Sequence, residues 1–241
     1  MDSEVWEWQK EWNQIDDFTE EDIRIIKTVK PYTLTTPVRI HALIQAVRYI
    51  VRNGIEGDMV ECGVWKGGSM MAIACALLNL GTKERNLRLY DTFEGMTKPS
   101  HVDINYLGHK AIDRFNIERT SENASTWALA SLGEVKENLL RTGYERAKIH
   151  FVKGRVEDTL PKEAPEKIAL LRLDTDWYKS TLHELTHLYP RLSKGGIVII
   201  DDYGHWKGSQ LATDEYFSKN KVRIFLSRID YAARLGVKLE C

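Results

Sequence analysis

Two pairs of aspartates follow two apolar segments of the chain and could together hold a metal ion. Asp174 and Asp176 follow one apolar run, and Asp201 and Asp202 follow the next. Apolar runs of this length are typical of buried strands, so we expect the four carboxylates at neighbouring strand ends. Like charges this close repel unless a cation neutralises them, and oxygen ligands favour Mg²⁺, Mn²⁺ or Ca²⁺ over Zn²⁺. The alternative is that each acid caps a helix or lies in solvent.

A glycine-rich turn follows an earlier apolar run and could cradle a cofactor. Residues 61–69 read Glu-Cys-Gly-Val-Trp-Lys-Gly-Gly-Ser, in which Gly63 allows a sharp turn and close approach of a ligand. The helix expected after it would point its first N–H groups at a carboxylate or phosphate. Asp91 ends the next apolar run and could accept hydrogen bonds from a ribose diol. Each motif alone could be a ligand-free turn or a cap, but together they favour an adenosine-type cofactor.

The remaining candidates give weaker signals. Residues 154–161 follow a third apolar run beside the expected ribose site, where they could contact an adenine. His183 and His187 lie four residues apart, a spacing that a metal could use, but no third ligand is evident and a solvated helix face is favoured. His205 follows the second aspartate pair and could face the site or simply pack.

The elements that position these residues alternate between strand and helix. We expect strands at residues 59–64, 87–91, 148–152, 168–173 and 197–200, then a hairpin at 223–229 and 233–239. We expect helices at residues 37–53, 69–80, 132–141, 181–192 and 209–219. This order predicts an α/β fold with a mostly parallel seven-stranded sheet, covered on both faces and closed by an antiparallel C-terminal hairpin.

The length of 241 residues predicts a single domain. Residues 1–35 are expected to form a helical N-terminal extension, and Trp6, Trp8 and Trp12 within it could mediate self-association into a homo-oligomer. Residues 97–127 form a longer connection than usual between a strand and a helix, which predicts a lid over the site.

Composition narrows the classes of partner. A formal net charge of -1 gives no reason to expect nucleic acid or an anionic membrane as partner. We find no apolar run of about 18 residues and no signal peptide pattern. The three cysteines are widely spaced and odd in number, which suits a reducing compartment, so a cytoplasmic location is expected.

Four motifs together resemble the macrocin O-methyltransferase (TylF/MycF-type) family. They are residues 61–69, Tyr-Asp-Thr-Phe-Glu-Gly-Met at 90–96, Leu-Asp-Thr-Asp-x-Tyr-x-Ser-Thr at 173–181 and Asp-Asp-Tyr-Gly at 201–204. The resemblance covers roughly residues 30–220. It implies the class I methyltransferase fold, a Rossmann-like three-layer sandwich, and dependence on S-adenosylmethionine and Mg²⁺. It also implies methylation of hydroxyl groups on sugars or related parts of macrolides and other natural products, as in antibiotic biosynthesis.

The resemblance also implies a role for each matching residue. Asp174, Asp201 and Asp202 are the implied metal ligands, and Asp176 is the implied general base beside Asp174 in the catalytic site. The implied cofactor contacts are Glu61, Gly63, Ser69, Asp91, Thr92, Val156, Glu157 and Asp174.

Three other functions compete with transfer to a sugar hydroxyl. A catechol-type methyltransferase would need an apolar slot for a planar acceptor, which Trp177, Trp206 and Tyr203 could form. A non-catalytic adenosine-binding or metal-binding module would not need four clustered acids. An NAD-linked dehydrogenase would need the G-x-G-x-x-G fingerprint, which residues 61–69 lack.

Overall fold

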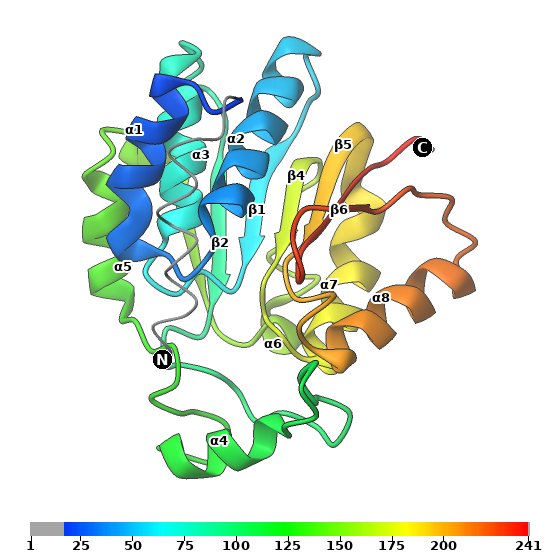
Figure 1. Cartoon of the computed structure of the whole chain (residues 1–241). Coiled ribbons are helices and arrows are strands. Elements are labelled where there is room, and N and C mark those ends of the chain that lie inside the picture. Colours follow the sequence, from blue (N-terminus) through cyan, green and yellow to red (C-terminus); the bar gives the residue numbers. More distant parts are fainter. Residues whose placement is uncertain (1–16, 241) are drawn as a thin grey trace.

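The structure, a computed structural model, describes residues 17–240 and is built around one seven-stranded sheet (Figure 1). The order of strands in the sheet is β3-β2-β1-β4-β5-β7-β6, and only β7 and β6 run antiparallel to their neighbours. The strands are β1 (Asp58–Cys62), β2 (Leu87–Asp91), β3 (Ile149–Lys153), β4 (Ile168–Leu173), β5 (Leu192–Ile200), β6 (Ser227–Arg228) and β7 (Arg234–Val237). The expected α/β fold, with its mostly parallel sheet and antiparallel C-terminal strands, is confirmed.

Helices cover both faces of the sheet, as the alternation of the sequence predicts (Figure 1). One face carries α1 (Glu20–Val29), α2 (Pro37–Arg52), α3 (Gly68–Asn79) and α5 (Leu132–Leu140), and the other carries α6 (Val156–Thr159), α7 (Tyr178–Leu188) and α8 (Lys207–Lys219). Alternate strand residues feed the two cores: Leu170 packs under the first layer, whereas Leu171 packs under the second.

Helix α2 begins where the sequence predicts. Thr36 accepts a hydrogen bond from the backbone N–H of Arg39, and Pro37 occupies the first helical position. The buried residues recur at helical spacing along one face of the helix, so that face is held against α3 and the sheet. The end of α2 toward Thr36 and Arg39 lies beside the carboxyl ends of the strands, which matters for the site below.

Several expected boundaries are wrong, among them those of α7, which runs over Tyr178–Leu188 and not over 181–192. Strand β5 begins at Leu192, whereas the expected strand begins only after Gly195 and Gly196. Gly195 stays within the strand because it can take a left-handed φ of 81° while its N–H donates to the carbonyl oxygen of Lys238. The two last strands are shorter than expected, because only residues 227–228 and 234–237 pair. Residues 156–159, expected as a loop, form the short helix α6.

The expected lid is an ordered segment with a helix of its own. Within residues 97–127, helix α4 (Ala111–Glu118) lies below the carboxyl ends of the strands (Figure 1). Residues 97–106 are the stem of this segment. Backbone hydrogen bonds attach the stem to the beginning of α8: Tyr106 N–H donates to His205 O at 2.9 Å, and Lys207 N–H donates to Ile104 O at 2.9 Å. Its closing over a ligand stays a prediction.

The N-terminal extension is described only from residue 17 onward, and there it contains α1. Thr19 and Asp22 form a reciprocal capping box at the start of this helix. The tryptophans at positions 6, 8 and 12 lie outside the described residues, so the expected self-association stays a prediction. No helix among residues 17–240 has the length and apolar character needed to cross a membrane.

Candidate active site

A cavity of about 320 Å³ opens beyond the carboxyl ends of β1, β2, β4 and β5. The sequence-predicted residues that line it are Glu61, Gly63, Ser69, Asp91, Asp174, Asp176, Asp201 and Asp202. A second, smaller cavity adjoins it and is lined by Thr92, Val156 and Glu157. Both cavities share Gly63, Asp91 and Asp174, so one ligand could extend through both. The structure therefore brings all the predicted site residues together.

Glu61, at the end of β1, presents an unpaired carboxylate oxygen inside the protein. Its side chain is 1% exposed, and one oxygen accepts a hydrogen bond from Arg172. The other, Oε2, has no hydrogen-bond partner among the described residues. Burial raises the pKa of Glu61 to about 7, although Arg172 opposes this. A buried oxygen without a donor is costly, so this corner of the cavity suits a ligand that brings a cationic or N–H donor.

The turn after β1 packs against neighbouring backbone at two positions where only glycine fits. A Cβ at Gly63, where φ is 79°, would lie 2.1 Å from the carbonyl oxygen of Asp174. A Cβ at Gly68, the first residue of α3, would lie 2.4 Å from the carbonyl oxygen of Tyr32. The chain thus folds tightly around the start of α3, whose first turn, including Ser69, lines the cavity.

Asp91 ends β2, lines both cavities and also holds the turn after β1 together. Its Oδ2 accepts hydrogen bonds from the backbone N–H groups of Val64 (2.7 Å) and Trp65 (3.3 Å), and its Oδ1 accepts one from Phe93 N–H (2.7 Å). Burial raises the pKa of Asp91, and these three hydrogen bonds oppose that shift. A carboxylate can accept about four hydrogen bonds, and the Thr92 hydroxyl, 3.4 Å from Oδ1, is already a fourth donor, so a diol would have to displace one of these donors.

Asp174, Asp176 and Asp202 face one another across the cavity. One carboxylate oxygen from each lies within 4.8 Å of the others. Burial, followed by the charge of Asp174, raises the pKa of Asp176 to about 8. Burial, followed by the charge of Asp176, raises the pKa of Asp202 well above its ordinary value. A divalent cation would relieve this repulsion, so the donor set fits Mg²⁺.

Asp201, a predicted metal ligand, is instead bound by two arginines. Arg172 Nη2 lies 2.7 Å from its Oδ1, and Arg39 Nη1 lies 2.5 Å from its Oδ2. Although burial opposes ionisation, the two guanidinium groups hold the pKa of Asp201 below its ordinary value. The facing trio therefore contains Asp176 where the sequence predicts Asp201. The assumption that all four acids need an added cation is wrong for Asp201, because the chain supplies its own cations.

Arg172 is the central residue that the sequence interpretation missed. Besides Asp201 it binds Glu61, and its Nη1 lies 2.8 Å from Asp174 Oδ2, so one guanidinium joins the cofactor corner to the acidic cluster. Its signal was visible, because it is the one charged residue in the otherwise apolar strand β4. Arg39 also binds Asp230, in the turn between β6 and β7, at 2.7 Å; no local pattern predicts that contact.

Asp176 takes an unusual backbone conformation with φ at 69°. Its N–H donates to Asp202 Oδ2 at 3.2 Å, and the next N–H, of Trp177, donates to Thr175 O at 2.8 Å. A left-handed conformation costs a non-glycine residue about 1–2 kcal/mol, so the surrounding contacts must hold it. Asp176 does not cap the following helix, which contradicts the capping alternative for this residue.

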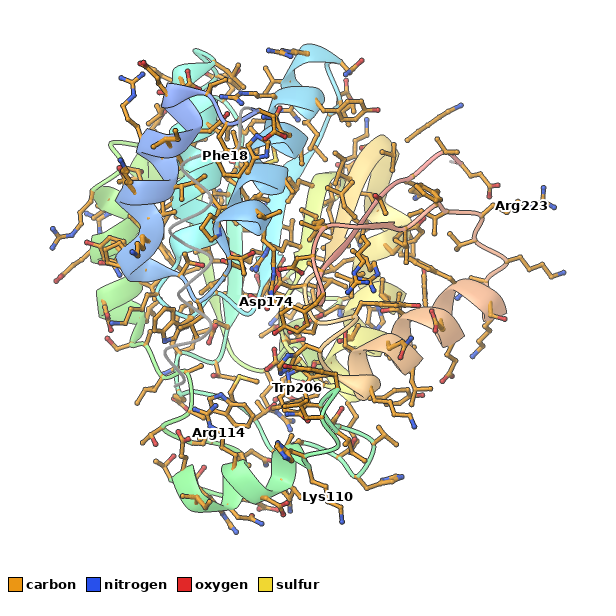
Figure 2. All side chains as sticks on the ribbon, in the orientation of Figure 1. Phe18, Lys110, Arg114, Asp174, Trp206 and Arg223 are labelled. Atoms are coloured by element: carbon orange, nitrogen blue, oxygen red, sulfur yellow. The ribbon has the colours of Figure 1, made fainter. Side chains whose placement is uncertain are left out.

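Aromatic side chains border the acidic cluster on the side of α4. Trp127, Trp177 and Trp206 contact one another with ring centroids 5.1–6.0 Å apart. Figure 2 shows Trp206 between Asp174 and the segment that carries Arg114. Of the slot predicted for a planar acceptor, only Trp206 lines the cavity, because Trp177 is 2% exposed and Tyr203 lies outside the lining.

Of the three histidines considered in the sequence, His205 lines the cavity, whereas His183 and His187 lie outside both cavities. The Nδ1 atom of His205 lies 3.0 Å from the hydroxyl of Tyr231. Burial lowers the pKa of His205, with a further contribution from Arg39. His183 and His187 contact each other on α7 with ring centroids 4.4 Å apart, and neither joins the acidic trio that could hold a metal among the described residues.

Comparison with known proteins gives one family and several relatives. The family model described as macrocin-O-methyltransferase (TylF) matches residues 9–235. Mycinamicin III 3''-O-methyltransferase of Micromonospora griseorubida is 34% identical over 172 residues, which are 71% of this chain and 65% of that protein. Demethyldecarbamoylnovobiocin O-methyltransferase of Streptomyces niveus is 32% identical over 202 residues, 83% of this chain and 72% of that protein. The chain thus spans slightly less than two thirds of the first relative.

Solved structures agree with the fold. The O-methyltransferase NovP superposes with a TM-score of 0.75 at 29% identity, covering 87% of this chain and 83% of that one. The O-methyltransferase TomG from Streptomyces achromogenes, whose structure is a complex with SAM, superposes with a TM-score of 0.56 over the whole of both chains. At 11% identity, the second likeness shows the fold alone.

Proposed function

The chain belongs to the macrocin-O-methyltransferase (TylF) family, and from this premise we propose that it methylates a hydroxyl group of a sugar on a natural product. S-adenosylmethionine is the proposed methyl donor, and Mg²⁺ or another divalent cation is the proposed activator. The observation that carries the proposal is a single cavity in which the unpaired Oε2 of Glu61 and the glycine turn adjoin the facing acids.

The residues at the cofactor end fit S-adenosylmethionine. Glu61 Oε2 could accept a hydrogen bond from the ammonium group of the methionine part, and Gly63 lets the turn after β1 lie against Asp174 at the edge of the cavity. Asp91 is the proposed partner of the ribose, and Val156 and Glu157 in the adjoining cavity are the proposed neighbours of the adenine. In an open parallel sheet this is the edge where ligands bind.

The residues at the acidic end fit a divalent cation. Asp174 and Asp202 belong both to the predicted ligand set and to the facing trio, so we propose them as the principal ligands. Asp201 would complete the set if Arg39 moved off its Oδ2. A bound divalent cation supplies one kind of chemistry here, because it lowers the pKa of a coordinated hydroxyl and fixes its direction.

The remaining steps fall to side chains of this protein. Asp176 is the proposed general base, because it lines the cavity and its carboxylate faces Asp174 and Asp202, where a coordinated hydroxyl would lie. The acceptor oxygen attacks the methyl carbon as the carbon–sulfur bond breaks, and the hydroxyl proton passes to Asp176. Holding oxygen, carbon and sulfur in line could by itself supply about 7 kcal/mol or more of the barrier reduction.

The names of the relatives support a glycosylated acceptor. One relative is named for the 3''-position of mycinamicin III, and another for the 4'-position of a rhamnosyl tetracenomycin. The cavity adds a reason of its own, since Trp127 and Trp206 offer apolar surface beside acids that could receive hydroxyl groups. We retain the catechol-type acceptor as an outcome to test.

The direct test uses methyl-labelled S-adenosylmethionine, Mg²⁺ and a panel of acceptors. Mycinamicin III and demethyldecarbamoylnovobiocin serve as sugar-bearing acceptors, and catechol serves as the planar diol. Transfer to a sugar hydroxyl is expected. Transfer to catechol alone would replace the proposed acceptor class, and cofactor binding without transfer to any acceptor would favour a non-catalytic module.

A second test concerns the cofactor contacts. Asp91→Asn is expected to weaken binding of S-adenosylhomocysteine by about tenfold, because the amide loses a charge-assisted hydrogen bond. Isothermal titration calorimetry measures this. Asp113→Asn is the matched control, since Asp113 is exposed on α4 and lines neither cavity. Unchanged affinity in Asp91→Asn would contradict the ribose assignment.

A further inference from the structure

Asp103 is a buried carboxylate in the stem of the 97–127 segment, and it makes contacts on both sides of that stem. It is 1% exposed. Its Oδ2 accepts hydrogen bonds from the N–H and the hydroxyl of Ser100, both at 2.6 Å, and its backbone oxygen accepts one from Ala111 N–H at 2.9 Å. These bonds organise the segment itself and place α4.

The other oxygen of Asp103 reaches a helix 75 residues further along the chain. Oδ1 accepts a hydrogen bond from the N–H of Tyr178, the first residue of α7, at 2.8 Å. The cap position of α7 is Trp177, whose side chain makes no capping hydrogen bond. Asp103 therefore acts as the N-cap of α7 from outside the helix, where a negative charge also interacts favourably with the helix dipole.

A second helix is shaped around the same carboxylate. Gly208 is the second residue of α8, and a Cβ there would lie 1.8 Å from Asp103 Oδ1 and 2.9 Å from Tyr178 N. Glycine is a poor helix former, so its presence in α8 needs a reason. The space that it leaves is occupied by Asp103, which thus lies between the beginnings of α7 and α8.

The loop between β4 and α7, residues 174–177, directly precedes Tyr178 and carries the proposed base. Asp176, with its φ of 69°, lies two residues upstream. Trp177 between them donates from its indole Nε1 to the carbonyl oxygen of Thr97, at 3.0 Å. Two hydrogen bonds, donated by Trp177 and Tyr178 to the stem, therefore hold the end of this loop. They fix the residues that directly follow Asp176, whose N–H donates to Asp202.

We propose that Asp103 is a positioning residue that holds the left-handed conformation of Asp176 by capping α7 from the stem of the lid. On this view the stem is a permanent part of the site, and only the portion beyond it could move with a ligand. The role of Asp176 as base rests on the proposed function, but the conformational claim can be tested without turnover.

The test measures hydrogen exchange of backbone amides in the ligand-free protein. Asp103→Ala is expected to speed exchange at residues 97–103 and 175–179 by about tenfold or more, because a charge-assisted hydrogen bond to a buried N–H is lost. Asp103→Asn keeps an oxygen that can accept from Tyr178 N–H, so it should restore most of the protection. Unchanged exchange in the alanine variant would overturn the proposal.

Gly208→Ala tests the same contact without altering Asp103, and it covers the case in which Asp103→Ala fails to fold. Alanine should stabilise an exposed helix position, yet here its Cβ would displace Oδ1 from Tyr178. Faster exchange at residues 175–179 is expected despite the better helix former. Gly133→Ala in α5 is the matched control, because the nearest atom to its Cβ is 3.9 Å away, and exchange there should not rise. Protection equal to wild type in Gly208→Ala would contradict the proposal.

Kinetics separates this proposal from a failure of the proposed function. If an acceptor is turned over, Gly208→Ala should lower kcat by about tenfold, while the Kd of S-adenosylhomocysteine by calorimetry stays as in wild type. If the affinity for S-adenosylhomocysteine also fell tenfold, the substitution would have disturbed the whole site, and the positioning role would be overturned. If wild type methylates no acceptor, the proposed function fails, but the exchange results still decide the role of Asp103.

Discussion

The acidic cluster has two halves that differ in how their charge is balanced. Asp201 is bound by Arg172 and Arg39, so its negative charge is neutralised by the protein itself. Asp174, Asp176 and Asp202 face one another with only Arg172 touching one of them, and the pKa values of all three lie above the ordinary value, chiefly through burial. Proteins rarely bury like charges without a purpose, so the unbalanced half marks where a cation is expected.

The largest expected effect comes from removing divalent cations, which tests directly whether Asp174, Asp176 and Asp202 need a cation. Treatment with EDTA is expected to lower methyl transfer about a thousandfold, since a Lewis acid contributes several kcal/mol at such a site. Added Mg²⁺ should restore the rate, measured with labelled S-adenosylmethionine, and an equal concentration of KCl is the control. Full turnover in EDTA would mean that the unbalanced half is a structural cluster.

The balanced half is tested by Arg172→Met. Removing one partner of a buried ion pair leaves uncompensated charge, so a loss of about 3–5 kcal/mol in the free energy of unfolding is expected. Urea denaturation measures it. Arg223→Met is the matched control, because Arg223 is exposed on the surface between α8 and β6, where a single substitution changes stability little. Equal stability of Arg172→Met and wild type would show that Glu61, Asp174 and Asp201 do not depend on this cation.

Within the unbalanced half, Asp176→Asn separates the base from the ligands. A loss of about a hundredfold in kcat is expected, because the amide cannot accept the hydroxyl proton. The affinity for S-adenosylhomocysteine should stay the same, since Asp176 lies at the acidic end of the cavity and not at the glycine turn. Turnover at the wild-type rate would remove Asp176 as the base.

The smallest effect concerns Glu184, a buried acid of α7 outside the cavity that also has no cationic partner. One oxygen accepts a hydrogen bond from the Thr175 hydroxyl at 2.9 Å, the other has no partner among residues 17–240, and burial raises its pKa well above the ordinary value. Burial thus favours the neutral carboxyl of Glu184 in the folded protein, whereas in the unfolded chain this carboxyl ionises above about pH 4.3. Stability should fall as pH rises from there toward the folded pKa.

Glu184→Gln should remove that pH dependence. The variant is expected to match wild type near pH 4 and to exceed its free energy of unfolding by about 1 kcal/mol or more at pH 8. Urea denaturation at both pH values measures the difference. A variant less stable than wild type at pH 8 would show that Glu184 is ionised in the fold and has found a donor.

Much of this architecture could be predicted from the sequence, because its signals are local. The apolar runs before Asp174 and Asp201 predicted two strands with neighbouring ends, and β4 and β5 do pair. Gly63 predicted the sharp turn after β1, where its φ is 79°. Arg39 could not be placed in the same way, since Arg39 and Asp230 meet only through the folded sheet. Asp103 lies in a polar stretch whose pattern gives no indication of a partner 75 residues away.

Gly208 limits how residues 97–127 can be exchanged between this chain and its relatives. A relative that receives residues 97–127 of this chain inherits the carboxylate of Asp103, and at the position that faces it the recipient must offer a helix residue without a side chain, as Gly208 does here. Grafts that carry the segment, the loop at 175–178 and the beginning of α8 as one cassette should retain solubility and turnover. Grafts of the segment alone into a recipient with alanine there should lose both.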